Sequence, residues 1–389
     1  MFRLKAILLT LLMSAALLFA AEGDTHTFEL QWQPEGFNER LGVEADRTKP
    51  FEKEPDFGEH KILRGQLATW NLDTEKDLDF IWDVTAGSLY VDLNGDGDLT
   101  NDPNGVLETH SDTGGCYQFH NFPEFSMSVE SQEGVHHYRI NATGQDYPSF
   151  HYVTFAIRSG YGGTVALYGQ NWKFEIVDRL RAQVDTGDTL SVRPTGQSGE
   201  APLQNYISEL PAPQRLFLDE HCYDMSFEFR KSESQTPALW CTLTERDVPL
   251  AKLRVEGQNI NQLVLNNGEM LVLPCLGDEE KTVPVGDFVC QGLSLKVDEE
   301  RTASPRMLSD IIISISADGE NVLRAGGPLN QSVHIERVGK TLRFNYEIIG
   351  AGGEKYDIQQ INNYDYNKKP SVAIYKGDLQ VGSVSFEYG

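Results

Sequence analysis

The chain has 389 residues, and its 58 acidic residues outnumber the 33 basic ones, which gives a formal net charge of −25 at pH 7. A surface this acidic repels phosphate backbones and anionic lipids, so nucleic acids and membrane surfaces are excluded as partners. The length is sufficient for two or three domains, each with its own core.

Residues 1–21 have the composition of a secretory signal peptide. Arg3 and Lys5 precede an apolar run over residues 6–18, and the small residues Ala20 and Ala21 follow it. Because the run is too short to cross a bilayer stably, we expect cleavage; an uncleaved anchor is the alternative. The mature protein is therefore predicted to be secreted or periplasmic, with no membrane insertion after signal cleavage.

Alternation of apolar and polar residues dominates the rest of the chain. Trp172, Phe174 and Ile176 alternate with charged residues, which is typical of a strand with one face in a core and the other in water. Many short strands separated by turns favour sheets packed on sheets. We therefore predict a mostly β protein with two or three antiparallel β-sandwich or barrel-like domains. The same alternation recurs over residues 223–230, 342–348 and 384–388.

Two stretches with little strand pattern predict the domain boundaries. Prolines recur between Pro194 and Pro213, and residues 297–310 are charged and contain Pro305. The C-terminal part resembles immunoglobulin-like or transthyretin-like sandwiches in architecture. The predicted organisation is a signal peptide (1–21), an N-terminal β domain (22–193), a linker (194–214), a middle β domain (215–300) and a C-terminal β-sandwich (301–389).

The sharpest chemical signal is an acidic loop that follows the predicted strand 89–91. Oxygen-bearing residues occupy alternate positions, and Gly97 falls where the chain must turn sharply. Calcium prefers six to eight oxygen ligands, and a tight loop can offer them from every second residue. We expect Asp98 to contribute its main-chain carbonyl and Thr100 to ligate directly or through water. The predicted metal ligands are Asp92, Asn94, Asp96, Asp98, Thr100 and Asp102.

This DxNxDGD pattern resembles the calcium loops of the EF-hand and dockerin families. It departs from them at Pro103, where an EF-hand has a bidentate glutamate, and Asp102 is the nearest replacement. A strand precedes the loop instead of an entering helix, so the resemblance implies a structural Ca²⁺ site and not a sensor. The alternative is a turn rich in Asn, Asp and Gly that binds nothing. As a whole, the chain resembles uncharacterised exported bacterial β proteins, a likeness that implies no known activity.

No catalytic motif stands out. Asp-Thr-Gly triplets at 112–114 and 185–187 lack the flanking residues of aspartic proteases, and ordinary turns explain them. His120, His137 and His151 lack the spacing of a metal site, and strand-surface histidines are common. A row of exposed tryptophans would instead provide a stacking platform for sugars. The chain has five tryptophans: Trp32, Trp70, Trp82, Trp172 and Trp240.

The five cysteines fit an oxidising compartment, and their odd number leaves at least one that is unpaired or pairs outside the chain. The pairs Cys222–Cys241 and Cys275–Cys290 each flank a polar loop, so we expect them to form disulfides and Cys116 to stay free.

Three functions follow from these observations. The first is a non-catalytic structural or binding protein stabilised by calcium, with a glycan or another envelope protein as partner. The second is a carbohydrate-binding module, and the third is a hydrolase whose polar residues converge from distant loops.

Overall fold

Nearly all of the regular secondary structure in the described residues is β-strand, which confirms the predicted fold class. Neighbouring strands are mostly antiparallel, and the pairs β14–β19 and β17–β24 are parallel. Residues 1–23 and most of the predicted linker lie outside the described residues. The computed structural model describes residues 24–45, 50–67, 78–109, 118–147, 150–178, 180, 184, 188–195, 215–232, 236–274, 280–296, 302–305, 311–356 and 371–385.

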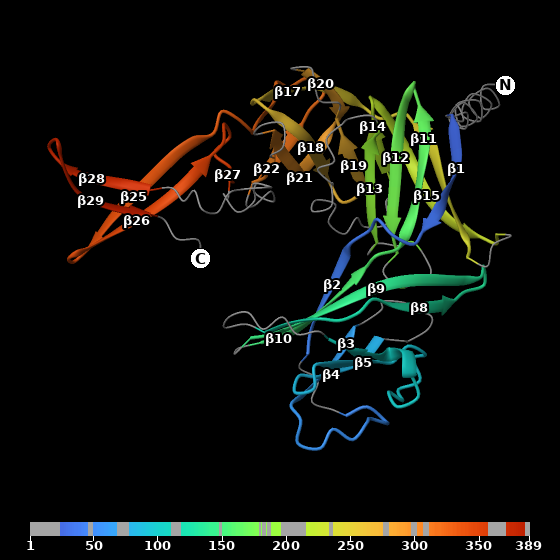
Figure 1. Cartoon of the computed structure of the whole chain (residues 1–389). Helices are drawn as coiled ribbons and strands as arrows, with labels where there is room; N and C mark the ends of the chain where they lie inside the picture. Colours follow the sequence, from blue (N-terminus) through green and yellow to red (C-terminus); the bar gives the residue numbers. More distant parts are fainter. Residues whose placement is uncertain are drawn as a thin grey trace, which may run out of the picture. The chain divides into compact units, whose positions relative to one another are not determined.

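The chain forms two compact units that interleave in the sequence (Figure 1). Among the described residues, unit 1 takes in 24–195 and 225–244, and unit 2 takes in 215–224 and 245–385. The elements of unit 1 are β1 (Thr25–Gln33), β2 (Glu39–Glu44), β3 (Ile62–Leu67), β4 (Leu78–Asp83), β5 (Ser88–Val91), the 3₁₀ turn η1 (Pro103–Gly105), β6 (Val106–Glu108), β7 (Gln118–Asn121), β8 (Phe125–Glu130), β9 (Val135–Asp146), β10 (His151–Ile157), β11 (Gly160–Leu167), β12 (Gln170–Val177), β13 (Thr189–Pro194), the second half of β15 (His221–Arg230) and most of β16 (Ala238–Arg246).

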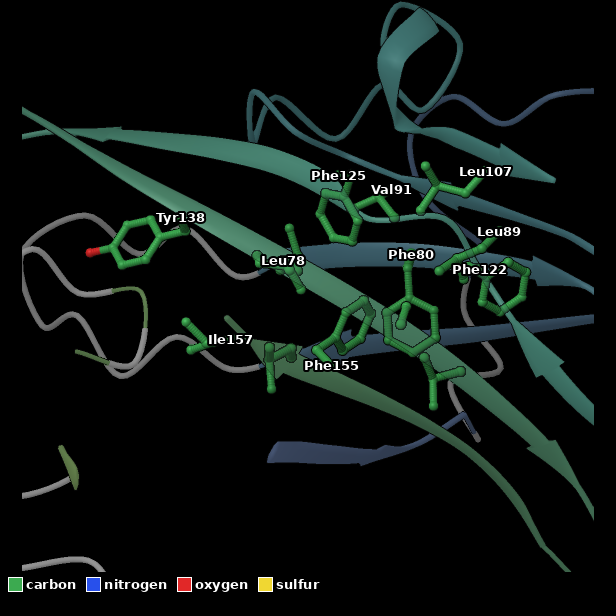
Figure 2. Packing of buried hydrophobic residues seen from close by; sticks show 14 of the residues in the cluster. Leu78, Phe80, Leu89, Val91, Leu107, Phe122, Phe125, Tyr138, Phe155 and Ile157 are labelled. Atoms are coloured by element: carbon green, nitrogen blue, oxygen red, sulfur yellow. The ribbon is translucent and has the colours of Figure 1, made fainter. Parts of the chain in front are cut away.

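Unit 1 contains a sandwich of two sheets. One sheet has the order β3-β4-β5-β6, and the other has the order β2-β10-β9-β7 with β8 also on β9. Their facing side chains form one core, in which the rings of Phe80 and Phe155 meet edge to face with centroids 5.3 Å apart. Figure 2 shows these two rings together with Val91 and Phe125 between the sheets. Burial of these alternating side chains is what fixes the two sheets together.

A further sheet in unit 1 runs β13-β12-β11-β1-β16-β15. The predicted strand around Phe174 is β12, and its apolar residues are buried as expected: Trp172 is 5 % exposed and Phe174 is 0 % exposed. The sequence pattern therefore identified both the strand and its inner face.

Unit 2 contains a second sandwich. Its core combines the sheet β14-β19-β18-β21 with the sheet β20-β17-β24 through residues such as Phe217, Leu253 and Phe288. Ile313 and Leu323, which lie in the segment 301–389 predicted as the C-terminal domain, belong to this same core. The strands of unit 2 are β14 (Arg215–Leu218), β17 (Leu250–Glu256), β18 (Ile260–Asn266), β19 (Met270–Leu273), β20 (Glu280–Pro284), β21 (Gly286–Lys296), β22 (Thr302–Ala303), β23 (Ile312–Ile315), β24 (Asn321–Arg324), β25 (Asn330–Val338), β26 (Thr341–Ile349), β27 (Lys355–Tyr356), β28 (Ser371–Lys376) and β29 (Leu379–Ser385).

The strands at the end of unit 2 are mostly exposed, although Tyr356 of β27 is buried and Ile348 of β26 packs against its cluster. The predicted strand 342–348 lies in β26, but Leu342 is 45 % exposed, and Ile335 on the paired strand β25 is 56 % exposed. The β25-β26-β27 sheet and the β28-β29 hairpin are separate sheets. An immunoglobulin-like or transthyretin-like packing of this region stays a prediction.

The predicted pair Cys222–Cys241 is wrong, because both thiols are free and buried. Cys222 packs in the core of unit 2, whereas Cys241 lies opposite Phe28 in unit 1, so each side chain fills its own core. Cys290 is also free and buried, which contradicts its pairing with Cys275. Cys275 and Cys116 lie outside the described residues.

Burial should keep these three thiols unreactive in the folded protein. It raises the pKa of Cys222 to about 11 and that of Cys290 to about 12, and it raises the pKa of Cys241 further, so almost no thiolate forms near neutral pH. Iodoacetamide without reductant should therefore alkylate Cys222, Cys241 and Cys290 only after unfolding. Mass spectrometry of the digest checks this, and a peptide linked through Cys222 and Cys241 would contradict it.

Candidate metal centre

The acidic loop begins where β5 leaves the sandwich core. Leu89 and Val91 are buried, and the Asp92 N–H donates to the Asp79 carbonyl at 2.9 Å, which extends the strand pairing by one residue. Asp92 itself is only 2 % exposed. A strand therefore precedes the loop, as the sequence predicted, and it fixes the first candidate ligand at the edge of the core.

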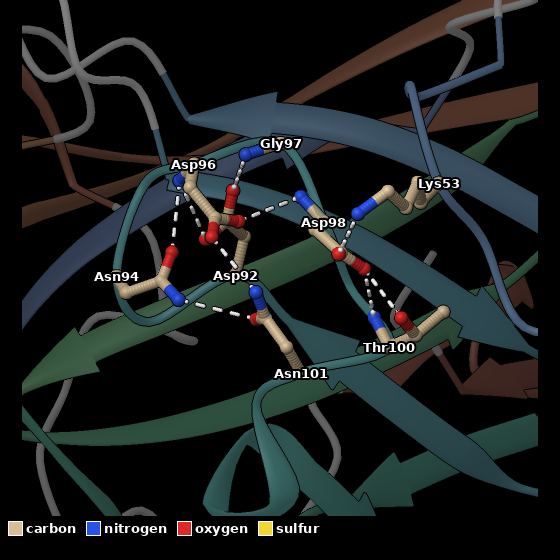
Figure 3. A network of polar contacts seen from close by, with 8 residues as sticks. All are labelled: Lys53, Asp92, Asn94, Asp96, Gly97, Asp98, Thr100 and Asn101. Carbon is tan, nitrogen blue, oxygen red and sulfur yellow. Dashed lines mark hydrogen bonds and ion pairs between the residues drawn. The ribbon is translucent and has the colours of Figure 1, made fainter.

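The loop turns around the carboxylate of Asp92 (Figure 3). Its Oδ1 accepts from the N–H of Gly95 at 2.6 Å and of Asp96 at 3.3 Å, and its Oδ2 accepts from Gly97 N–H at 2.7 Å. Gly95 and Gly97 have φ of 68° and 77°, a left-handed conformation that glycine adopts without strain. The glycines thus let successive N–H groups converge on one buried carboxylate.

Asn94, Asp96 and Asn101 form a second layer of side chains in the loop. Asn94 Nδ2 donates to Asn101 Oδ1 at 3.1 Å, and Asn101 Nδ2 donates to Asp96 Oδ2 at 2.8 Å. This bond from Asn101 is the main reason that the pKa of Asp96 is lowered. Asn101 was not among the predicted metal ligands. The only feature of the sequence that pointed to it is its amide side chain next to Asp102.

The side chains of Asp98 and Thr100 face a different partner. Asp98 Oδ2 accepts from Lys53 Nζ at 2.6 Å, and its Oδ1 accepts from both the N–H and the hydroxyl of Thr100. The bond with Lys53 is the largest cause that lowers the pKa of Asp98 to about 2. Figure 3 shows this trio beside the Asp92 group, joined to it where the Asp98 N–H donates to Asp96 at 2.8 Å. Asp98 can therefore offer its carbonyl to an ion but keeps its carboxylate on Lys53.

Asp102 is a buried carboxylate at the base of the loop. It is 9 % exposed, it accepts a hydrogen bond from the Leu93 main chain, and its Oδ2 has no hydrogen-bond partner among the described residues. Burial, followed by the negative charges of Asp92 and Asp96, raises the pKa of Asp102. A buried carboxylate without a full set of partners is costly, so this oxygen marks a place where a cation would be stabilised.

Hydrogen bonds to the Asp96 N–H connect the side chains of Asp92 and Asn94 within the loop. Asp102 lies close enough for the charges of Asp92 and Asp96 to raise its pKa. The Asp98 carboxylate instead pairs with Lys53, and Thr100 donates to that carboxylate. Across the described part of the chain, no group of three or more His, Cys, Asp or Glu side chains is arranged to hold a metal ion. A calcium shell of this type also uses amide and main-chain oxygens, and a carboxylate oxygen that accepts one N–H keeps a second lone pair.

No protein-family model, curated protein or solved structure matches this chain. Within the described ranges, no helix has the length and the apolar character needed to span a bilayer.

The other residues considered in the sequence have separate structural partners. His120 is buried with its ring against Trp82, His137 lies within 3.0 Å of Ser128 Oγ, and His151 pairs with Asp146 at 2.6 Å, so these histidines form no common site. Trp82 and Trp172 are core residues and provide no sugar platform. Trp70 and both Asp-Thr-Gly triplets lie outside the described residues.

Proposed function

We propose that this chain is a non-catalytic structural or binding protein of the cell exterior, stabilised by one Ca²⁺ in the loop 92–102. The ligands are the side chains of Asp92, Asn94, Asp96 and Asp102, the main-chain carbonyl of Asp98, and Thr100 directly or through water. An acidic surface of net charge −25 favours cations and disfavours nucleic acid as a partner. A glycan or another envelope protein remains the candidate partner.

The observation that carries this proposal is the unpartnered oxygen of Asp102 beside two other carboxylates. Asp92 and Asp96 both raise the pKa of Asp102, so their charges lie close enough to repel it. The ion pair of Lys53 is with Asp98, and its charge also acts on Asp96 over a longer distance. A cation among Asp92, Asp96 and Asp102 would relieve their mutual repulsion and give the buried oxygen a partner.

The donor set favours calcium over other metals. All of the candidate ligands are oxygens from carboxylates, an amide, a hydroxyl and a carbonyl, which suits a hard cation and not zinc or copper. The flanking elements are a strand (β5) and a 3₁₀ turn (η1), so a pair of helices that could open on binding is lacking at this loop. The ion therefore stabilises the fold, and an affinity of about 10⁻⁴–10⁻³ M is sufficient outside the cell.

Thermal unfolding with Ca²⁺ or with EGTA tests the proposal. At about 100 times Kd, calcium should add about 2.7 kcal/mol to the free energy of unfolding, a rise in melting temperature of about 5–10 °C. The double variant Asp92→Ala, Asp96→Ala should lose this response. Asp102→Asn should also lose it, yet it should be at least as stable as wild type in EGTA, because the substitution removes a buried charge.

Asp98→Asn is the matched control, since it keeps the main-chain carbonyl and removes only the carboxylate that faces Lys53. This variant should keep the calcium response. If wild type and the Asp92, Asp96 double variant respond alike, the site assignment is wrong.

A further inference from the structure

A segment distant in sequence covers the outer face of the sheet that carries the loop. Residues 50–58, called the strap here, lie against β4 and β5 on the side away from the sandwich core. Ile81 on this face is 0 % exposed because it packs with Phe51 of the strap and with Leu99 of the loop. Phe57 meets Tyr90 edge to face, with ring centroids 5.2 Å apart. The strap thus completes a small apolar cluster that the sheet could not bury alone.

The main chain of the strap is bonded to the acidic loop. The Lys53 N–H donates to the Gly97 carbonyl at 3.4 Å, and the Leu99 N–H donates to the Lys53 carbonyl at 3.2 Å, as in a parallel β-bridge. Lys53 Nζ adds the ion pair with Asp98 at 2.6 Å. A separate ion pair between Glu54 and Arg64 ties the strap to β3. The strap therefore depends on the conformation of residues 97–99.

We infer that the ion in the loop controls whether the strap covers this face, so that removing Ca²⁺ uncovers Ile81 and Tyr90. This inference rests on the calcium site proposed above. Residues 97–99 hold the strap through Gly97 and Leu99, and they follow directly on Asp96. Without the ion, repulsion among Asp92, Asp96 and Asp102 loosens the loop, which withdraws both the main-chain bonds and the Leu99 side chain from the strap.

Amide hydrogen exchange on the full chain, with Ca²⁺ or with EGTA, tests the inference. The N–H groups of Lys53 and Leu99 make the strap bonds, and they should exchange at least tenfold more slowly with calcium. Amides of β12 in the same unit should change much less, because that strand does not touch the loop. Calorimetric titration with Ca²⁺ measures binding independently of the strap.

Variants separate the strap from ion binding. Leu99→Ala removes an apolar contact and no ligand, so calcium should still bind while the protection of the Lys53 amide disappears. Phe51→Ala, which lies outside the loop, should have the same effect. Phe119→Ala is the matched control: this side chain is 38 % exposed on β7 of the opposite sheet, away from the strap, and its loss should leave the protection intact.

The outcomes distinguish the two proposals. If calcium binds and the exchange of Lys53 and Leu99 does not change, the strap inference is overturned and the ion site stands. If the titration shows no binding, the calcium site is wrong, and the strap inference falls with it. Calcium binding together with protection that Leu99→Ala and Phe51→Ala abolish supports both.

Discussion

Phe155→Ala should destabilise unit 1 by about 3–5 kcal/mol, because it empties the centre of the sandwich core. Phe155 is 0 % exposed, and its ring packs against Phe80 of the opposite sheet. The surrounding core side chains are closely packed, so they cannot move far enough to fill the cavity that the phenylalanine ring leaves between the two sheets. Urea unfolding followed by tryptophan fluorescence measures the change, since Trp82 lies in the same core.

Ile335→Ala is the matched comparison in the terminal hairpin of unit 2. Ile335 is 56 % exposed on β25, so its truncation should cost no more than about 0.5 kcal/mol. A cost of several kcal/mol there would mean that a second layer covers β25 and β26. That result would support the immunoglobulin-like or transthyretin-like sandwich and would contradict the exposure seen in this hairpin.

The strands were predictable because their signal is local. Alternation along Trp172, Phe174 and Ile176 depends only on neighbours two positions away, and β12 has the predicted inner face. The alternation in β26 is equally regular, yet its apolar residues are at most half-buried. A pattern of period two shows which residues share a face, but it does not show whether another sheet covers that face.

The candidate site was predictable in part for the same reason. Asp92, Asn94 and Asp96 are close in sequence, and the two glycines determine how the chain turns around them. The carboxylate of Asp98 faces Lys53, which is 45 residues away. The sequence contains no local signal for such a contact, so it could not show that the Asp98 carboxylate has a partner outside the loop.

Acid should weaken unit 1 through His136, by about 2 kcal/mol between pH 7 and pH 5. This side chain is 1 % exposed on β9; its Nε2 lies 3.1 Å from Ser131 Oγ, and its ring packs edge-on against Phe229, with centroids 4.6 Å apart. Burial is the main cause that lowers its pKa from 6.5 to about 4. Between pH 6.5 and about pH 4, His136 is protonated in the unfolded chain and neutral in the folded chain. The free energy of unfolding therefore falls as the pH is lowered through this range.

Comparing urea unfolding at pH 7 and pH 5 isolates this contribution. His136→Phe keeps an aromatic ring against Phe229 and removes the titrating group, so the loss of stability between the two pH values should shrink by about 2 kcal/mol. Thr143→Ala, on the same strand β9, removes no titrating group and should leave the pH dependence as in wild type. Equal pH dependence in wild type and His136→Phe would show that His136 is not the group that couples folding to acid. The buried His120, whose pKa is also lowered by burial, would then be the next residue to substitute.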